Sequence, residues 1–259
     1  MRPSADPVLL LCAHGSRARS AQVATQEIAQ AVSQALPSAE VVLTWVDVQE
    51  PNVEARCEEF ADRPVVIVPL LLAAGFHVYK DLAETVADRP HHVVTDALGP
   101  DRLLSELMAR RIMETELGET GVAETDPDPH LVMVAAGSSD ARAVRAVRQQ
   151  AADLEELTGR PVTTGFVSAA HPKAHQAVAE AWHNGAHHVT TVSFHVAPGV
   201  FHRDAAAAAQ TPAPGAPSEH AATGGRVTEP LLIDGAEVPA EVVDVVVKRW
   251  EQGRALLGA

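Results

Sequence analysis

The chain has 259 residues, of which 46% are hydrophobic and 21% charged, a composition typical of a globular protein with a sizeable core. Its formal net charge of −14 excludes nucleic acid as a general partner, because neutralising phosphates requires a basic face. The longest apolar runs, such as 65–76, are shorter than the ~20 residues that span a bilayer, so we expect no membrane partner. Residues 1–7 lead into a strand without a signal-peptide pattern, which favours a cytoplasmic protein.

Strands and helices alternate along the first half of the sequence. A continuously apolar strand is predicted at Val8–Ala13, and the helix after it carries apolar residues every three or four positions until Pro37. Further strands are predicted at 41–48, 65–72 and 93–98, each followed by a helix. The helix after the third strand is expected to begin near Asp81. This alternation predicts an α/β fold with a mostly parallel sheet.

The second half repeats the first. Prolines and acidic residues at 124–130 predict a linker, after which LVMVAAGS (131–138) restates LLLCAHGS (9–16). Landmarks recur at offsets of 121 to 124 residues: Gly15 and Gly137, Pro51 and Pro172, Gly75 and Gly199. We therefore predict two tandem, similar α/β domains at 1–123 and 131–259, each with a four-stranded, mostly parallel sheet flanked by helices.

The two copies differ in the side chains that can bind a metal ion. At the corresponding positions, the first copy has His14, Asp47 and His77, and the second has Ala136, Ser168 and Phe201, with His202 one place along. Metal-binding groups are thus concentrated in the first copy. This asymmetry predicts that the first copy carries the activity and that the second is a retained scaffold.

His14, Asp47 and His77 each fall at or just after the end of a predicted strand. In a parallel α/β sheet, ligands bind beyond the carboxyl ends of the strands, so the three side chains can converge on one crevice. Two imidazoles and a carboxylate suit a divalent transition ion such as Fe²⁺, Co²⁺, Ni²⁺ or Zn²⁺. The alternative for each histidine is an ordinary capping or hydrogen-bonding role at a strand end.

Polar and basic residues surround the two candidate histidines. Ser16 follows Gly15 after a buried strand, where such a turn can bind an anion at a helix N-terminus. Arg17, Arg19 and Lys80 are basic residues in an otherwise acidic chain and can capture carboxylates of a substrate. The alternative is ordinary surface charge.

Other features are open to two interpretations. His171, His175 and His183 are predicted on one helix, as a solvated face or as a zinc pair. His195 and His202 flank Pro198-Gly199 and either contribute to the ligand site or do not. The segment 211–225, rich in Pro, Ala and Gly, is either a surface loop or a lid.

Several segments resemble one known family. LCAHGSR (11–17) resembles the opening motif of the class II tetrapyrrole chelatases, in the sirohydrochlorin cobaltochelatase and ferrochelatase branch. VPLLLAAGFHVYKD (68–81) resembles the second motif of that family. WVDVQEP (45–51) resembles the segment in which the family carries Glu, with Asp47 at that position here. The resemblance covers nearly the whole chain, and the second half is similar to the degenerate copy of the long, two-domain members.

The resemblance implies a chelatase fold of two similar domains facing each other across a cleft. It implies His14 and His77 as metal-binding and catalytic residues, with Asp47 as a further candidate metal ligand. The candidate substrate-binding residues are Ser16, Arg17 and Lys80. The implied reaction inserts Fe²⁺, giving siroheme, or Co²⁺, giving cobalt-sirohydrochlorin for a cobalamin pathway. The metal is then a substrate, and no organic cofactor is expected.

Two alternatives remain at this point. One is a non-catalytic carrier of metal or tetrapyrrole on the same fold, and the other is a chelatase for another tetrapyrrole. The expected partner is sirohydrochlorin. The internal duplication favours a monomer with pseudo-twofold domains, because it supplies in one chain what a shorter relative needs a dimer to make.

Overall fold

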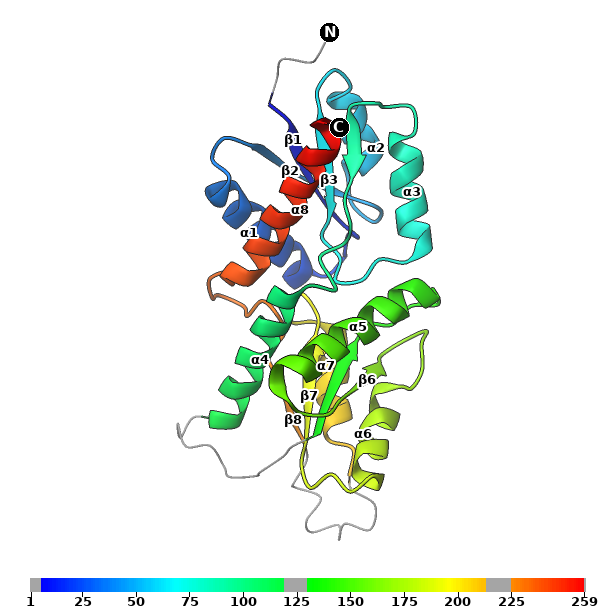
Figure 1. Ribbon diagram of the computed structural model, residues 1–259, viewed down its shortest axis with the longest axis vertical. Helices are drawn as coiled ribbons and strands as arrows, with labels where there is room; N and C mark the ends of the chain where they lie inside the picture. Colours follow the sequence, from blue (N-terminus) through cyan, green and yellow to red (C-terminus); the bar gives the residue numbers. More distant parts are fainter. Residues whose placement is uncertain (1–5, 119–129, 213–224, 259) are drawn as a thin grey trace. The chain divides into compact units, whose positions relative to one another are not determined.

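The structure, a computed structural model, describes residues 6–118, 130–212 and 225–258, without the side chains of Phe76 and His77 (Figure 1). The described chain forms two compact units, the first made of Met1–Asp101 and Val238–Ala259 and the second of Arg102–Glu237. Most of the predicted linker and residues 213–224 of the predicted loop lie outside the described residues. His130, placed in the linker, instead begins a strand.

The first unit is a four-stranded parallel sheet covered by helices. Its strands, in spatial order, are β2 (Glu40–Trp45), β1 (Val8–Ala13), β3 (Val65–Pro69) and β4 (His92–Val94). Its helices are α1 (Arg19–Ala35), α2 (Val53–Glu59), α3 (Phe76–Val86) and α8 (Ala240–Gly258). Every residue of β1 and β3 is buried, which is why these strands are continuously apolar.

The second unit has the same architecture. Its strands, in spatial order, are β6 (Val162–Phe166), β5 (His130–Ala135), β7 (Val189–Phe194) and β8 (Arg226–Val227). Its helices are α4 (Arg102–Leu117), α5 (Ala141–Thr158), α6 (Ala174–His183) and α7 (Val200–Ala209). The predicted α/β fold with two similar four-stranded sheets is confirmed.

The repeat extends to backbone details. Gly15 and Gly137 adopt φ of +95° and +90°, respectively. A Cβ atom added to Gly15 would lie 1.9 Å from the Asp47 carbonyl oxygen, and one added to Gly137 would lie 2.1 Å from the Ser168 carbonyl oxygen. The His14 carbonyl accepts the Asp47 N–H at 3.1 Å, as the Ala136 carbonyl accepts the Ser168 N–H at 2.9 Å. The two halves thus share the same turn after their central strand, independently of the side chains that it carries.

Each unit contains one helix from the other half of the sequence. The apolar face of α4, which includes Leu104, Leu107 and Met108, is buried in the second unit, where α4 packs on α5. The C-terminal helix α8 packs on α1 and β3 of the first unit. The predicted division into 1–123 and 131–259 therefore differs from the observed units, because the apolar pattern of a helix does not tell which sheet buries it.

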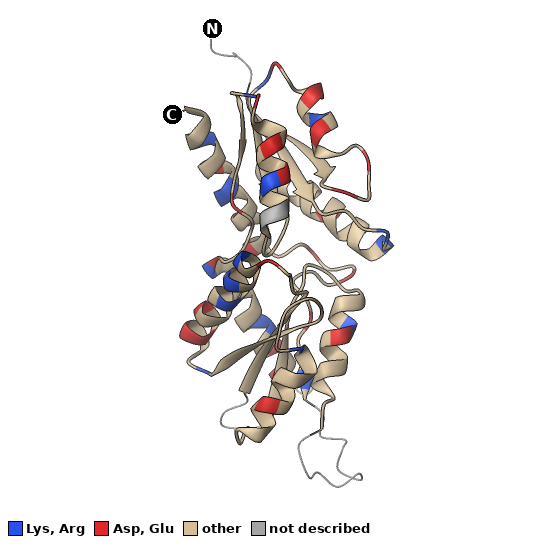
Figure 2. Cartoon of the chain, turned by 90° about the vertical axis from the view of Figure 1, so that its right-hand side faces the viewer, with Lys and Arg blue, Asp and Glu red and all other residues tan. Residues whose placement is uncertain are grey.

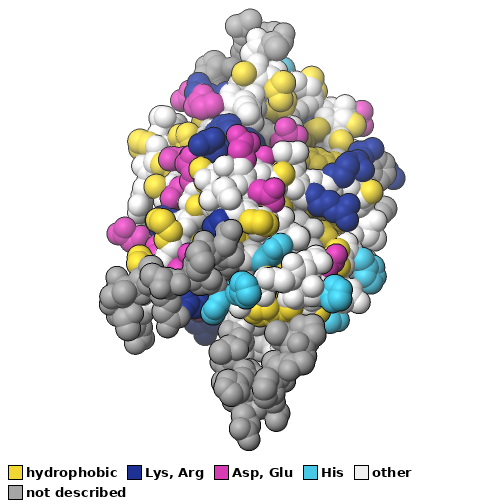
Figure 3. Space-filling model, turned by 60° about the horizontal axis from the view of Figure 1, so that its bottom comes forward, with side chains coloured by type: hydrophobic (Ala, Val, Ile, Leu, Met, Phe, Trp, Pro, Cys, Tyr) yellow, Lys and Arg dark blue, Asp and Glu magenta, His cyan; other side chains and the backbone are white. Residues whose placement is uncertain are grey.

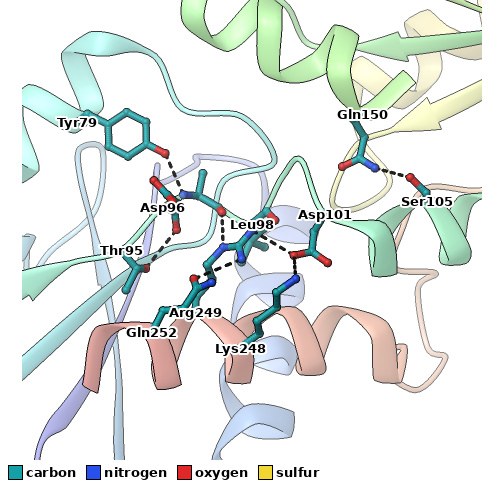
Figure 4. Close-up of polar contacts among 11 residues, drawn as sticks. Tyr79, Thr95, Asp96, Leu98, Asp101, Ser105, Gln150, Lys248, Arg249 and Gln252 are labelled. Carbon is teal, nitrogen blue, oxygen red and sulfur yellow. Dashed lines mark hydrogen bonds and ion pairs between the residues drawn. The ribbon is translucent and has the colours of Figure 1, made fainter. Parts of the chain in front are cut away.

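Arg249 fastens α8 to the loop that follows β4 (Figure 4). This buried side chain donates from Nε to the Ala97 carbonyl at 2.8 Å and from Nη2 to the Leu98 carbonyl at 2.9 Å. Its Nη2 also lies 3.3 Å from Oδ2 of Asp101, which accepts from Lys248 Nζ at 2.6 Å. A buried guanidinium is thereby supplied with carbonyl and carboxylate partners, as its desolvation requires.

Some predicted boundaries are wrong. Helix α3 begins at Phe76 and not near Asp81, because the Tyr79 N–H already bonds to the Gly75 carbonyl. Strand β2 ends at Trp45 and not at 48, since Val48 adopts a left-handed φ of 70° within a turn. Strands β3 and β4 are shorter than 65–72 and 93–98.

The predicted placement of three histidines on one helix is also wrong. His171 precedes α6, which begins at Ala174, because the residue before a proline (Pro172) avoids the helical conformation. Its spacing to His175 is therefore not helical, and the zinc-pair interpretation loses its basis. Separately, no helix among the described residues has the length and apolar character needed to span a membrane.

We predict that Gly137→Ala lowers the free energy of unfolding by about 3 kcal/mol, because the new Cβ combines a left-handed backbone with a carbonyl clash. The matched control is Gly185→Ala, which has the same φ of +90° but no atom within 4 Å of the new Cβ. Urea unfolding of both variants separates backbone strain from the clash. Equal losses in the two variants would contradict the close approach.

We also predict that Arg249→Leu lowers the free energy of unfolding by about 3 kcal/mol, because it removes the guanidinium donor of the Ala97 and Leu98 carbonyls and one of the partners of Asp101. Arg254→Leu, on the same helix, removes a side chain that is 49% exposed and ion-paired with Glu251. That control is expected to change stability only slightly. Similar effects of the two substitutions on thermal unfolding would argue against the anchoring role of Arg249.

Candidate functional site

The three segments with predicted metal ligands meet at one edge of the first sheet. His14 follows β1, Asp47 lies two residues after β2, and His77 is the second residue of α3, the helix after β3. Because β1 pairs with both β2 and β3 in parallel, the carboxyl ends of these strands are neighbours. The fold therefore brings these segments together where parallel α/β sheets bind ligands.

His14 and Asp47 are joined through their backbones. The hydrogen bond from Asp47 N–H to the His14 carbonyl continues the pairing of β1 and β2 beyond both strands. Both side chains are exposed at this edge. Oδ1 of Asp47 accepts the Val48 N–H at 2.7 Å, which fixes the carboxylate close to its own turn. An imidazole and a carboxylate thus leave adjacent backbone positions.

His77 lies in the first turn of a helix, a position that sequence reasoning placed in a loop. Its side chain is outside the described residues. The helix is anchored two residues further on, where the Tyr79 hydroxyl accepts the Ala97 N–H at 2.9 Å (Figure 4). Burial raises the pKa of Tyr79, so its hydroxyl stays protonated. Since Arg249 holds the same loop, α8 and α3 are linked through Ala97.

Ser16 is built into the turn after His14. Its hydroxyl accepts the Ala18 N–H at 3.1 Å, and its own N–H donates to Gln49 Oε1 at 2.9 Å. Arg17 is exposed, and Lys80 lies 3.5 Å from Glu84 in an exposed ion pair. Ser16 and Arg17 therefore share the edge with His14, while the charge of Lys80 is partly offset on its own helix.

Histidines are visible on the face of the molecule shown in Figure 3. Within the described part of the chain, however, no three His, Cys, Asp or Glu side chains are grouped so that they could hold a metal ion. The side chain of His77 lies outside the described residues, so the set of His14, Asp47 and His77 stays a prediction.

The second unit contains a histidine cluster whose hydrogen bonds the sequence did not predict. The Ser193 hydroxyl lies 2.9 Å from Nδ1 of His195 and 3.0 Å from Nδ1 of His202. His195 is 6% exposed, and burial, assisted by the nearby His202, lowers its pKa to about 4. One hydroxyl can donate to one imidazole and accept from the other, so Ser193 can form hydrogen bonds to both rings at once. The alternating positions 193 and 195 at the end of β7 were the available signal.

A cavity of about 550 Å³ lies elsewhere in the second unit. It is lined by His130 and Val162, which begin β5 and β6, and by Glu180 near the end of α6. None of the predicted site residues lines it. The cavity is therefore separate from the predicted site residues of the first unit.

A family model for CbiX matches residues 8–115 and 130–221, which is more than half of the chain. The chain belongs to the CbiX family. The matched ranges include all six predicted site residues of the first unit and the corresponding positions of the second. The CbiX match thus covers both copies of the repeat.

Known relatives agree with membership of the CbiX family. A sirohydrochlorin cobaltochelatase from Sulfolobus acidocaldarius is 23% identical over 109 residues, covering 40% of this chain and 87% of that protein. The fold is similar to SirB from Bacillus subtilis with Fe³⁺, with a TM-score of 0.75 at 18% identity over 97% of this chain and 96% of that one. It is also similar to CbiX, the terminal enzyme of siroheme biosynthesis in denitrifying bacteria, with a TM-score of 0.64 at 18% identity over 95% and 98%.

We predict that acid destabilises the protein partly through His195. The pKa falls from 6.5 in the unfolded chain to about 4 in the folded one, so the unfolded state binds a proton first as the pH drops. This group should remove about 2 kcal/mol of stability between about pH 7 and about pH 5, and the loss should be complete below the folded pKa.

The measurement is urea unfolding of the wild type and of His195→Gln at both pH values. The variant should lose less stability on acidification than the wild type. His187→Gln, which replaces an exposed histidine, should keep the wild-type dependence. An identical pH dependence of wild type and His195→Gln would contradict a buried neutral imidazole.

Proposed function

We propose that this protein inserts a divalent metal ion into sirohydrochlorin, with His14 and His77 as metal-binding and catalytic residues. The observation that carries the proposal is the CbiX match over both halves, combined with the convergence of the segments bearing His14, Asp47 and His77 at one sheet edge. The cobaltochelatase relative supports the substrate class.

The proposed chemistry exchanges two protons for one metal ion. The imidazoles of His14 and His77 take the hydrated ion and displace part of its water. As the metal enters, the two pyrrole N–H bonds break, and one proton passes to each of the two imidazoles, which release the metal ion as they become protonated. Asp47, beside His14, offsets positive charge on the ion and is proposed as a third ligand.

Ser16, Arg17 and Lys80 are proposed to bind the substrate at the same edge. Arg17 is exposed, so its guanidinium is accessible to a carboxylate of the macrocycle. The substrate metal is Fe²⁺ or Co²⁺, since imidazole and carboxylate ligands accept both. Insertion leaves the oxidation state of the metal unchanged, so the reaction requires no organic redox cofactor.

A carrier without turnover and a chelatase for another tetrapyrrole are less favoured. The Sulfolobus acidocaldarius relative and SirB from Bacillus subtilis subspecies spizizenii are sirohydrochlorin chelatases by name, and a carrier has no need of a proton-accepting imidazole at the metal. We further propose that the protein is a monomer, because the chain contains both copies of the repeat. We also propose that it is cytoplasmic.

The test is an anaerobic assay of the purified protein with sirohydrochlorin and Fe²⁺ or Co²⁺, followed by the absorbance change of the macrocycle. We predict that His14→Ala and His77→Ala each lower the insertion rate by about a hundredfold or more, to near the rate without protein. His187→Ala, which removes an exposed histidine of the second unit, should retain wild-type activity.

A wild-type rate equal to the protein-free rate, together with binding of the macrocycle, would replace the chelatase with the carrier. Wild-type activity in both variants would refute the assigned roles of His14 and His77 and leave the reaction itself standing.

A further inference from the structure

Many arginines of this acidic protein form ion pairs. Within the described chain, ion pairs with carboxylates are made by Arg56, Arg63, Arg102, Arg110, Arg111, Arg160, Arg249 and Arg254. With 34 acidic residues against 20 basic ones, an arginine on the surface readily finds an acidic neighbour. An arginine that lacks one is therefore informative.

The described arginines that make no hydrogen bond or ion pair with another described residue have a common location. Only their side chains lack such a partner, and they all lie on connections from a strand to the following helix or on that helix: Arg17, Arg19, Arg145, Arg148 and Arg203. Arg145 is in the second turn of α5, after β5, and Arg203 is the fourth residue of α7, after β7. Both helices start at the carboxyl edge of the second sheet, the edge where ligands bind.

The charge pattern of α5 opposes helix stability. Arg142, Arg145 and Arg148 lie toward its N-terminus and the acidic residues toward its C-terminus, which is also visible in Figure 2. The helix dipole instead favours acidic residues near the N-terminus and basic residues near the C-terminus, by roughly 0.3–1 kcal/mol for each charge in a terminal turn. Asp140 caps this helix through the Arg142 N–H at 2.7 Å, but the first turn contains no acidic residue. Helix stability therefore does not explain these arginines.

The corresponding positions of the first copy are not basic. At the repeat offset of 122, Arg145 replaces Val23, and Arg148 replaces Gln26; at the offset of 124, Arg203 replaces Tyr79. At these positions positive charge is thus specific to the second copy, whereas the first copy carries Arg17, Arg19 and Lys80 at other positions of its own connections and helices. Asp204 follows Arg203, but successive residues of a helix point in different directions.

We propose that Arg145 and Arg203 of the second copy bind carboxylates on the rim of the tetrapyrrole, in addition to Arg17 and Lys80 of the first copy. This inference rests on the proposed function, which supplies a polycarboxylate substrate. A net charge of −14 repels such a substrate, so its capture requires unpaired local cations at a ligand-binding edge. Exposed, uncompensated guanidinium groups meet that requirement, and they bind carboxylates with two hydrogen bonds.

The test is titration of the full-length protein with metal-free sirohydrochlorin, followed by the absorbance of the macrocycle. We expect the Arg145→Gln/Arg203→Gln double variant to bind about tenfold more weakly at low ionic strength, or about threefold per exposed arginine. The factor should shrink at high ionic strength. The matched control is Arg56→Gln/Arg254→Gln, which changes the net charge equally but removes arginines already paired with Glu59 and Glu251.

A thermal melt separates binding from structure. Because Arg145 opposes the dipole of α5, Arg145→Gln should melt no lower than the wild type although it binds the macrocycle more weakly. Equal binding by the double variant and its control would overturn the inference, even if metal insertion is intact. Conversely, arginine-dependent binding without insertion by the wild type would support this surface and remove the chelatase proposal.

Discussion

At Gly15 the chain leaving β1 approaches the turn after β2 so closely that a Cβ atom would lie 1.9 Å from the Asp47 carbonyl oxygen. Glycine satisfies both the left-handed backbone and the lack of space. The approach places the His14 carbonyl on the Asp47 N–H, and the two candidate ligands consequently leave one short stretch of paired backbone. The second copy keeps the same approach at Gly137 although it carries no metal-binding pair there. The close approach is therefore a property of the fold, and it does not depend on the candidate metal ligands of the first copy.

The exchange of α4 and α8 makes each sheet depend on a helix from a remote part of the chain. Because Arg249 of α8 holds the carbonyls of Ala97 and Leu98, the C-terminal helix also orders the loop that contacts Tyr79 of α3. Removing helix α8 would thus affect helix α3, which begins beside His77, about 160 positions earlier in the sequence. The repeat is tandem in sequence but not separable in structure.

The alternation of apolar strands and amphipathic helices, together with the repeated LLLCAHGS pattern, was enough to predict both sheets and their parallel strands. It was not enough to predict the units, since periodicity identifies the buried face of α4 but not the sheet that buries it. The site followed the same division. The position of His14 after β1 could be predicted because strand ends are visible in sequence. The sharing of the Ser193 hydroxyl by His195 and His202 could not, because it depends on a contact between a strand and the next helix.

The distribution of charge over the two copies has a physical reason. A divalent cation and a polycarboxylate impose opposite electrostatic demands, because arginines close to a metal site repel the incoming ion while carboxylates close to the macrocycle repel the substrate. One copy of a fold has a single ligand-binding edge on which both demands must be met. The second copy has an edge of its own, where Arg145 and Arg203 add positive charge to that of Arg17 beside His14. Under the proposed function the second copy therefore needs no histidine pair, because its edge serves the electrostatic demand of the macrocycle and not that of the metal ion.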